Sequence, residues 1–133
     1  MMKRLLAGIS VALLAIFAVA CGSNGAAKQS SSNGSKIQVV ASLDFYGEVA
    51  KAVGGNKVSV QSIINNPAVD PHDYEPTTKV GKSVASADLV VASGIGYDGW
   101  MDKVVKSADK SKNYLRVADD LMNKKEGDNE HIW

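Results

Sequence analysis

Histidine, cysteine and proline are all scarce in this chain. Among 133 residues there are two histidines, one cysteine and three prolines, and the formal net charge is only +1. The fifteen basic residues form no run or stripe that would neutralise a phosphate backbone, so the sequence does not indicate a nucleic-acid partner. Since one cysteine cannot form a disulfide within the chain, we expect a fold held together without one.

The first twenty residues have the composition of a signal peptide. The segment "MMKR" is positively charged, and "LLAGISVALLAIFAVA" follows with sixteen uncharged residues. That run is shorter than the roughly twenty apolar residues that a transmembrane helix needs. Small residues precede Cys21 in "AVAC", and the polar residues that follow are typical of a flexible tether. We interpret 1–20 as a signal peptide and 21–35 as a tether.

This arrangement resembles a bacterial lipoprotein signal, in which the cysteine receives a diacylglyceryl group and becomes the new N-terminus. By that resemblance, Cys21 is the lipidation site, and the protein is extracytoplasmic and anchored to the cell membrane through its lipid. Ala18 departs from the usual pattern, because a leucine is more common at that position.

The remainder of the chain alternates between β-branched runs and apolar residues at helical spacing. Strands are predicted over 36–42, 57–64, 88–93 and 113–119, and helices over 43–55, 77–87 and 99–111. The apolar positions of the first helix are Leu43, Phe45, Val49, Ala52 and Val53. The order βαβαβαβ predicts an α/β fold with a Rossmann-like parallel four-stranded sheet and flanking helices.

Both histidines are predicted to lie at one edge of this sheet. Right-handed crossovers place every strand-to-helix loop at the carboxyl edge, where open α/β sheets bind their ligands. His72 follows the second strand in "VDPHDYEPT", and His131 follows the fourth strand in "DNEHIW". The topology therefore brings together two side chains that are far apart in the sequence.

Neutral imidazole is a good ligand for zinc and other divalent transition metals. A ligating histidine usually donates its other N–H to a carboxylate or carbonyl group. Asp70 and Asp73 flank His72, and Glu130 precedes His131, so these acids are possible orienting groups. Tetrahedral zinc needs two further ligands. A surface histidine among acids is more often a solvated loop residue than a ligand, so the pattern by itself leaves both interpretations open.

Several segments resemble the zinc/manganese family of ABC-transporter solute-binding lipoproteins. The segment "DPHDYEPT" resembles the first metal motif of that family, and "NEHIW" resembles the beginning of the second. "SGIGYDGWMDK" is similar to the segment between the two motifs, and "KIQVVASLDFYGEVAKAVGG" is similar to the start of the folded part. The resemblance implies that His72 and His131 are metal ligands. It also implies that 36–133 is the N-terminal lobe of a two-lobed protein.

The family resemblance also implies a function without catalysis. We expect the extracytoplasmic solute-binding component of an ABC importer for a divalent transition metal, with zinc favoured over manganese. The expected partners are a membrane permease and its cytoplasmic ATPase, and the expected state is a monomer. Because the sequence stops inside the second motif, we expect a truncated form without the second lobe, which would supply two more ligands.

The sequence leaves two other interpretations open. "GIGYDG" over 94–99 has the glycine spacing of a dinucleotide-binding loop, and Asp119 lies about twenty residues beyond it. The motif follows the third strand, however, whereas that fingerprint usually follows the first. The third interpretation is an inert surface adhesion lipoprotein, which shares the leader and the tether but needs no metal.

Overall fold

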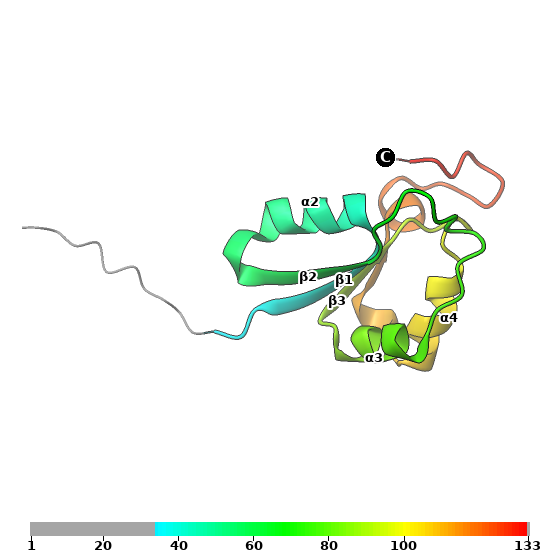
Figure 1. The fold of residues 1–133 in the computed structure, drawn as a ribbon. Coiled ribbons are helices and arrows are strands. Elements are labelled where there is room, and N and C mark those ends of the chain that lie inside the picture. Colours follow the sequence, from blue (N-terminus) through cyan, green and yellow to red (C-terminus); the bar gives the residue numbers. More distant parts are fainter. Residues whose placement is uncertain (1–33, 133) are drawn as a thin grey trace, which may run out of the picture. The chain divides into compact units, whose positions relative to one another are not determined.

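The structure, a computed structural model, describes residues 34–132 of the chain (Figure 1). The expected signal peptide, Cys21 and the tether up to residue 33 lie outside the described residues. The strands are β1 (Ile37–Leu43), β2 (Val58–Ile64), β3 (Leu89–Ala92) and β4 (Tyr114–Arg116), and the helices are α2 (Asp44–Gly54), α3 (Thr78–Ser86) and α4 (Trp100–Ser107). Between 34 and 132, no helix has the length and apolar character required to cross a membrane.

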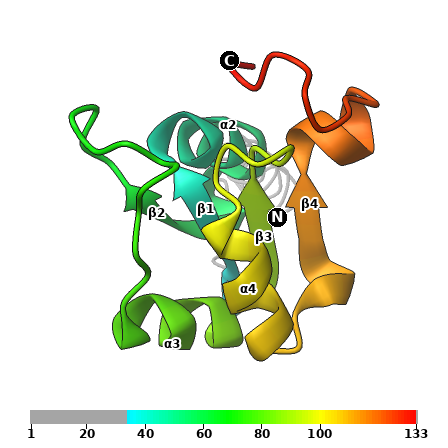
Figure 2. The same ribbon diagram turned by 90° about the vertical axis from the view of Figure 1, so that its right-hand side faces the viewer.

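The four strands form one parallel sheet in the order β2-β1-β3-β4. Residues 39–41 of β1 pair with β2 on one side and with β3 on the other, so β1 lies inside the sheet. α2 covers one face, while α3 and α4 lie together on the opposite face (Figures 1 and 2). This arrangement follows from right-handed crossovers, because the chain reverses direction across the sheet after β2. The predicted fold class is confirmed.

The core lies where the sheet meets these helices. β1 buries Val39, Val40 and Ala41, and β3 buries Val90, Val91 and Ala92. Such continuous apolar runs are expected of parallel strands that are covered on both faces. The predicted apolar positions of the second and third helices are confirmed, since the core also contains Val80, Val84, Ala87, Trp100, Met101 and Val105.

The predicted apolar face of the first helix was wrong in part, because Leu43 is buried and Phe45 packs against the core, but Val49, Ala52 and Val53 are exposed. Val49 and Val53 are 60% and 86% exposed, whereas Tyr46 and Gly47 are the buried residues of α2. The reason is the close approach of the helix to β2. A Cβ atom at Gly47 would collide with the Ser62 hydroxyl oxygen, and glycine avoids this contact at the present spacing. The glycine therefore allows this side of α2 to face the sheet.

The last strand is shorter than the sequence predicts. β4 ends at Arg116, and a single π-helical turn follows over Val117–Leu121. The Asp120 carboxylate accepts a hydrogen bond from the Arg116 backbone N–H at 2.8 Å. Because that N–H is bonded to a side chain four residues ahead, the chain turns at this point instead of continuing as a strand.

Candidate functional site

A cleft of about 490 Å³ opens at the carboxyl edge of the sheet. Its walls come from the ends of β1 and β2, the loop after β2, the loop after β3 and the C-terminal segment. Figure 2 shows the arrows of β3 and β4 pointing toward the edge where that segment lies. His72 and His131 both line the cleft, together with Tyr97. The structure thus brings the two histidines to one site, as the topology predicts.

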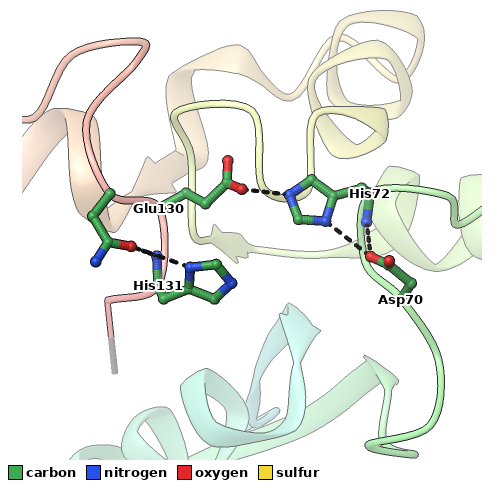
Figure 3. A network of polar contacts seen from close by, with 5 residues as sticks. Asp70, His72, Glu130 and His131 are labelled. Atoms are coloured by element: carbon green, nitrogen blue, oxygen red, sulfur yellow. Dashed lines mark hydrogen bonds and ion pairs between the residues drawn. The ribbon is translucent and has the colours of Figure 1, made fainter.

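Carboxylates contact both ring nitrogens of His72 (Figure 3). Nδ1 lies 2.9 Å from Oδ1 of Asp70, and the same oxygen accepts the His72 backbone N–H at 2.9 Å. Nε2 lies 2.7 Å from Oε1 of Glu130. The side chain of His72 is 39% exposed. The hydrogen bond to Asp70 has the largest effect on the pKa of His72, followed by the one to Glu130. Both raise this pKa, because the carboxylates favour the imidazolium form.

His131 is held in the same way as His72. The side-chain oxygen of Asn129 accepts the backbone N–H of His131 at 3.0 Å and lies 3.1 Å from its Nδ1. Both histidines therefore follow an Asp or Asn by two residues and fold back onto its oxygen. When Nδ1 donates to that oxygen, the neutral ring carries its lone pair on Nε2, which is the atom that can coordinate a metal.

Tyr97 contacts both histidine rings. Its ring centroid lies 4.9 Å from that of His72 at an interplanar angle of 86°, and 5.5 Å from that of His131 at 65°. The Tyr97 side chain is buried. Burial, followed by the Asp70, Asp98 and Glu130 charges, raises the pKa of Tyr97, so the phenol remains neutral. The sequence interpretation assigned this residue no role.

Asp98 holds the loop that carries Tyr97. Its carboxylate is 1% exposed and accepts the backbone N–H groups of Ser93 at 2.7 Å and Gly94 at 3.0 Å. Burial raises the pKa of Asp98 even though these donors stabilise its charge. Tyr46 supports the other side of the site, since its hydroxyl oxygen lies 3.2 Å from the carbonyl oxygen of Ile132, next to His131.

The loop after β3 is not arranged as a phosphate cradle. Gly94, Ile95 and Gly96 all have positive φ, and the Ile95 N–H donates to Asp119 Oδ2 at 3.0 Å. A Cβ atom at Gly94 would collide with the same carboxylate oxygen. Acidic side chains therefore occupy the place where a pyrophosphate would need N–H donors, and their charge would repel it. This geometry counts against the dinucleotide-binding interpretation.

The remaining predicted groups have different surroundings. Asp70 and Glu130 both contact His72, but no hydrogen bond or ion pair between 34 and 132 links Asp73 to either histidine. Tyr74, from the same loop as His72, packs against Trp100 with ring centroids 4.7 Å apart. Among the described residues, no group of three His, Cys, Asp or Glu side chains is already arranged to hold a metal ion.

The chain is similar to known proteins in both sequence and fold. The family described as ZnuA, zinc-uptake complex component A, periplasmic, matches residues 39–133. The manganese ABC transporter substrate-binding lipoprotein PsaA of Streptococcus pneumoniae is 32% identical over 99% of this chain and 46% of its own length. The iron ABC transporter substrate-binding lipoprotein MtsA of Streptococcus pyogenes is 35% identical over 83% of this chain and 36% of its own.

Solved structures of similar fold are also larger than this chain. The metal-dependent lipoprotein YcdH of Bacillus subtilis is 26% identical with a TM-score of 0.56, covering 65% of this chain and 32% of its own. Zn(II)-bound AdcA of Streptococcus pneumoniae is 26% identical with a TM-score of 0.55, covering 65% and 19%. The chain spans about half the length of the curated relatives it matches, and its fold corresponds to one lobe of the solved structures. The chain belongs to the ZnuA family.

Proposed function

We propose that this chain supplies the N-terminal, metal-capturing lobe of the extracytoplasmic solute-binding component of an ABC importer for a divalent transition metal. Membership of the ZnuA family supports the class. The observation that carries the proposal is the pair of matched turns, Asp70-Pro71-His72 and Asn129-Glu130-His131. Each turn orients an imidazole by its Nδ1, and both rings line the same cleft.

His72 and His131 coordinate the cation through Nε2, and the lobe contributes no reaction. Asp70 and Asn129 set the orientation of the rings, and Tyr97 packs against both of them. The cation is the cargo, so it is bound and later released unchanged. In this proposal a second lobe completes the coordination sphere, since tetrahedral zinc requires four ligands.

Zinc is favoured over manganese in this lobe. Imidazole suits zinc well, while manganese prefers carboxylate, carbonyl and water oxygens. The two histidines argue for zinc, and the acids beside them keep manganese as the alternative. The relatives named above are described as manganese and iron transporters as well as a zinc-bound protein, so the family accommodates more than one cation.

The partners of the proposed receptor are a membrane permease and a cytoplasmic ATPase. Relatives named as substrate-binding lipoproteins of ABC transporters support this assignment. Lipidation of Cys21 would hold the protein at the outer face of the cell membrane, with residues up to 35 as the tether. A monomer is sufficient for this role, because one copy presents both histidines.

Titration of the full chain with Zn²⁺ and with Mn²⁺ tests the proposal. A cation at a hundred times its Kd should stabilise the fold by about 2.7 kcal/mol, which raises Tm by roughly 10–20 °C for a domain of this size. His72→Ala and His131→Ala should each abolish most of that rise. Asp73→Ala is the matched control from the same loop and should retain it.

Two results would contradict the proposal. One is the absence of a Tm rise with either cation, and the other is an equal rise in His72→Ala and in the wild-type chain. A Tm rise with a nicotinamide dinucleotide would instead support the enzyme interpretation. If neither a metal cation nor a nicotinamide dinucleotide raises Tm, the interpretation as an inert surface lipoprotein is the one that remains.

A further inference from the structure

Glu130 has a contact that an orienting residue does not need. His72 is already oriented by Asp70, which bonds both its backbone N–H and its Nδ1. Glu130 lies instead on Nε2, at 2.7 Å (Figure 3), and Nε2 is the ring nitrogen that would bind the proposed cation. A carboxylate at that position either leaves when the metal arrives or becomes one of its ligands.

We propose that Glu130 coordinates the cation together with His72, as a further ligand from this same lobe. The inference rests on the proposed function and adds a carboxylate to its two imidazoles. Glu130 comes from the C-terminal segment and His72 from the loop after β2, so the pair joins two segments that are 58 positions apart. The cation would take the place of the hydrogen bond that now links them.

The distances fit this exchange with a small movement. Zinc binds histidine nitrogen at about 2.0–2.1 Å and carboxylate oxygen at about 2.0–2.2 Å. Tetrahedral geometry then separates the two donor atoms by roughly 3.4 Å, so Nε2 and Oε1 must part by about 0.7 Å from their present 2.7 Å. The Glu130 side chain is 32% exposed, which leaves space for that movement.

The position of His131 agrees with this role. It follows Glu130 directly and lines the same cleft as His72. The three side chains are not grouped as a ready site in the described part of the chain. In this proposal His72 and Glu130 bind the cation first, and the turn that carries Asn129 and His131 then moves toward it.

Loss of affinity alone would not prove ligation. Removing a partner outside the coordination sphere already weakens metal binding by about 10–100-fold, so Glu130→Ala would behave similarly in either role. A thiolate gives a direct signal, because a cysteine that ligates Co²⁺ produces a sulfur-to-metal charge-transfer band in the near ultraviolet. Cysteine is itself a good ligand for such metals.

The experiment compares Glu130→Cys with Asp73→Cys in the full chain, each titrated with Co²⁺. We expect the charge-transfer band in Glu130→Cys, saturating at one equivalent. Asp73→Cys, from the loop that carries His72, should show no more of the band than the wild-type chain, whose Cys21 sets the background. Far-ultraviolet circular dichroism of each variant establishes that it is folded.

The possible outcomes separate the two proposals. If His72→Ala abolishes Co²⁺ binding but folded Glu130→Cys binds Co²⁺ without the band, Glu130 is not a ligand, and the proposed function stands. The inference is likewise overturned if the Asp73→Cys band is as strong as that of Glu130→Cys. If His72→Ala leaves binding intact, the proposed function itself fails.

Discussion

Replacing Asp98 by alanine should be among the most destabilising single changes near the site. Its carboxylate is 1% exposed and accepts two backbone N–H groups, at 2.7 Å from Ser93 and 3.0 Å from Gly94. These bonds close the turn that presents Tyr97 to the two histidines. Asp98→Ala leaves both N–H groups buried without their acceptor, and a buried donor without a partner is costly.

The size of the effect follows from these two bonds. Hydrogen bonds to a charged group contribute about 1.5–3 kcal/mol each, so the pair contributes roughly 3–6 kcal/mol. Part of that is offset, because burial opposes the charged form and raises the pKa of Asp98. We therefore expect Asp98→Ala to lower the free energy of unfolding by about 2–4 kcal/mol, and Asp98→Asn, which keeps one acceptor oxygen, by about 1–2 kcal/mol.

Urea unfolding followed by circular dichroism measures both variants, with the exposed Glu48→Ala as a control that should stay within about 0.5 kcal/mol. The pH dependence gives a second test. Because the native pKa of Asp98 is raised, its contribution favours folding most below the unfolded pKa of about 3.9 and declines as pH rises through the native pKa. Asp98→Asn should remove that decline. A folded Asp98→Ala as stable as the wild type would refute the reasoning.

Further predictions concern the cleft and the helices. The pKa of His72 is raised, first by Asp70, and the neutral form that binds metal predominates only above that pKa. Zn²⁺ affinity measured by calorimetry should therefore fall as the pH falls through the His72 pKa. The contribution of the imidazolium form to folding stability has the opposite pH dependence, because it is present below the unfolded pKa of about 6.5 and is lost as the pH rises through the raised native pKa. Asp70→Asn should lower the His72 pKa in an NMR titration, and an unchanged value would contradict this assignment. Gly54→Ala should destabilise the fold by about 1–3 kcal/mol, because a Cβ there would collide with the branched Val58 side chain. A Cβ atom at Gly81 has no neighbour within 4 Å, so Gly81→Ala should stabilise the fold by about 0.5–1 kcal/mol. If thermal scans show that both variants shift Tm in the same direction, packing does not decide the outcome.

Some features of the site that the sequence analysis missed had a signal in the sequence. Asn129 stands two residues before His131, as Asp70 stands before His72, and an Asp or Asn at that spacing readily bonds the following backbone N–H. The role of Tyr97 had no such signal. An aromatic residue in a glycine-rich loop is usually a packing residue, and only the contacts with both imidazoles distinguish it.

The amino-acid sequence by itself determined the order of strands and helices, and with it the parallel sheet and the edge at which both histidines lie. Period-two and helical spacing reflect how side chains leave each element, so they can be read locally. Tertiary structure alone decided that α2 turns Gly47 rather than Val49 toward the sheet, and that Glu130 reaches His72. Those outcomes depend on how closely two distant segments approach, and no local pattern encodes that distance.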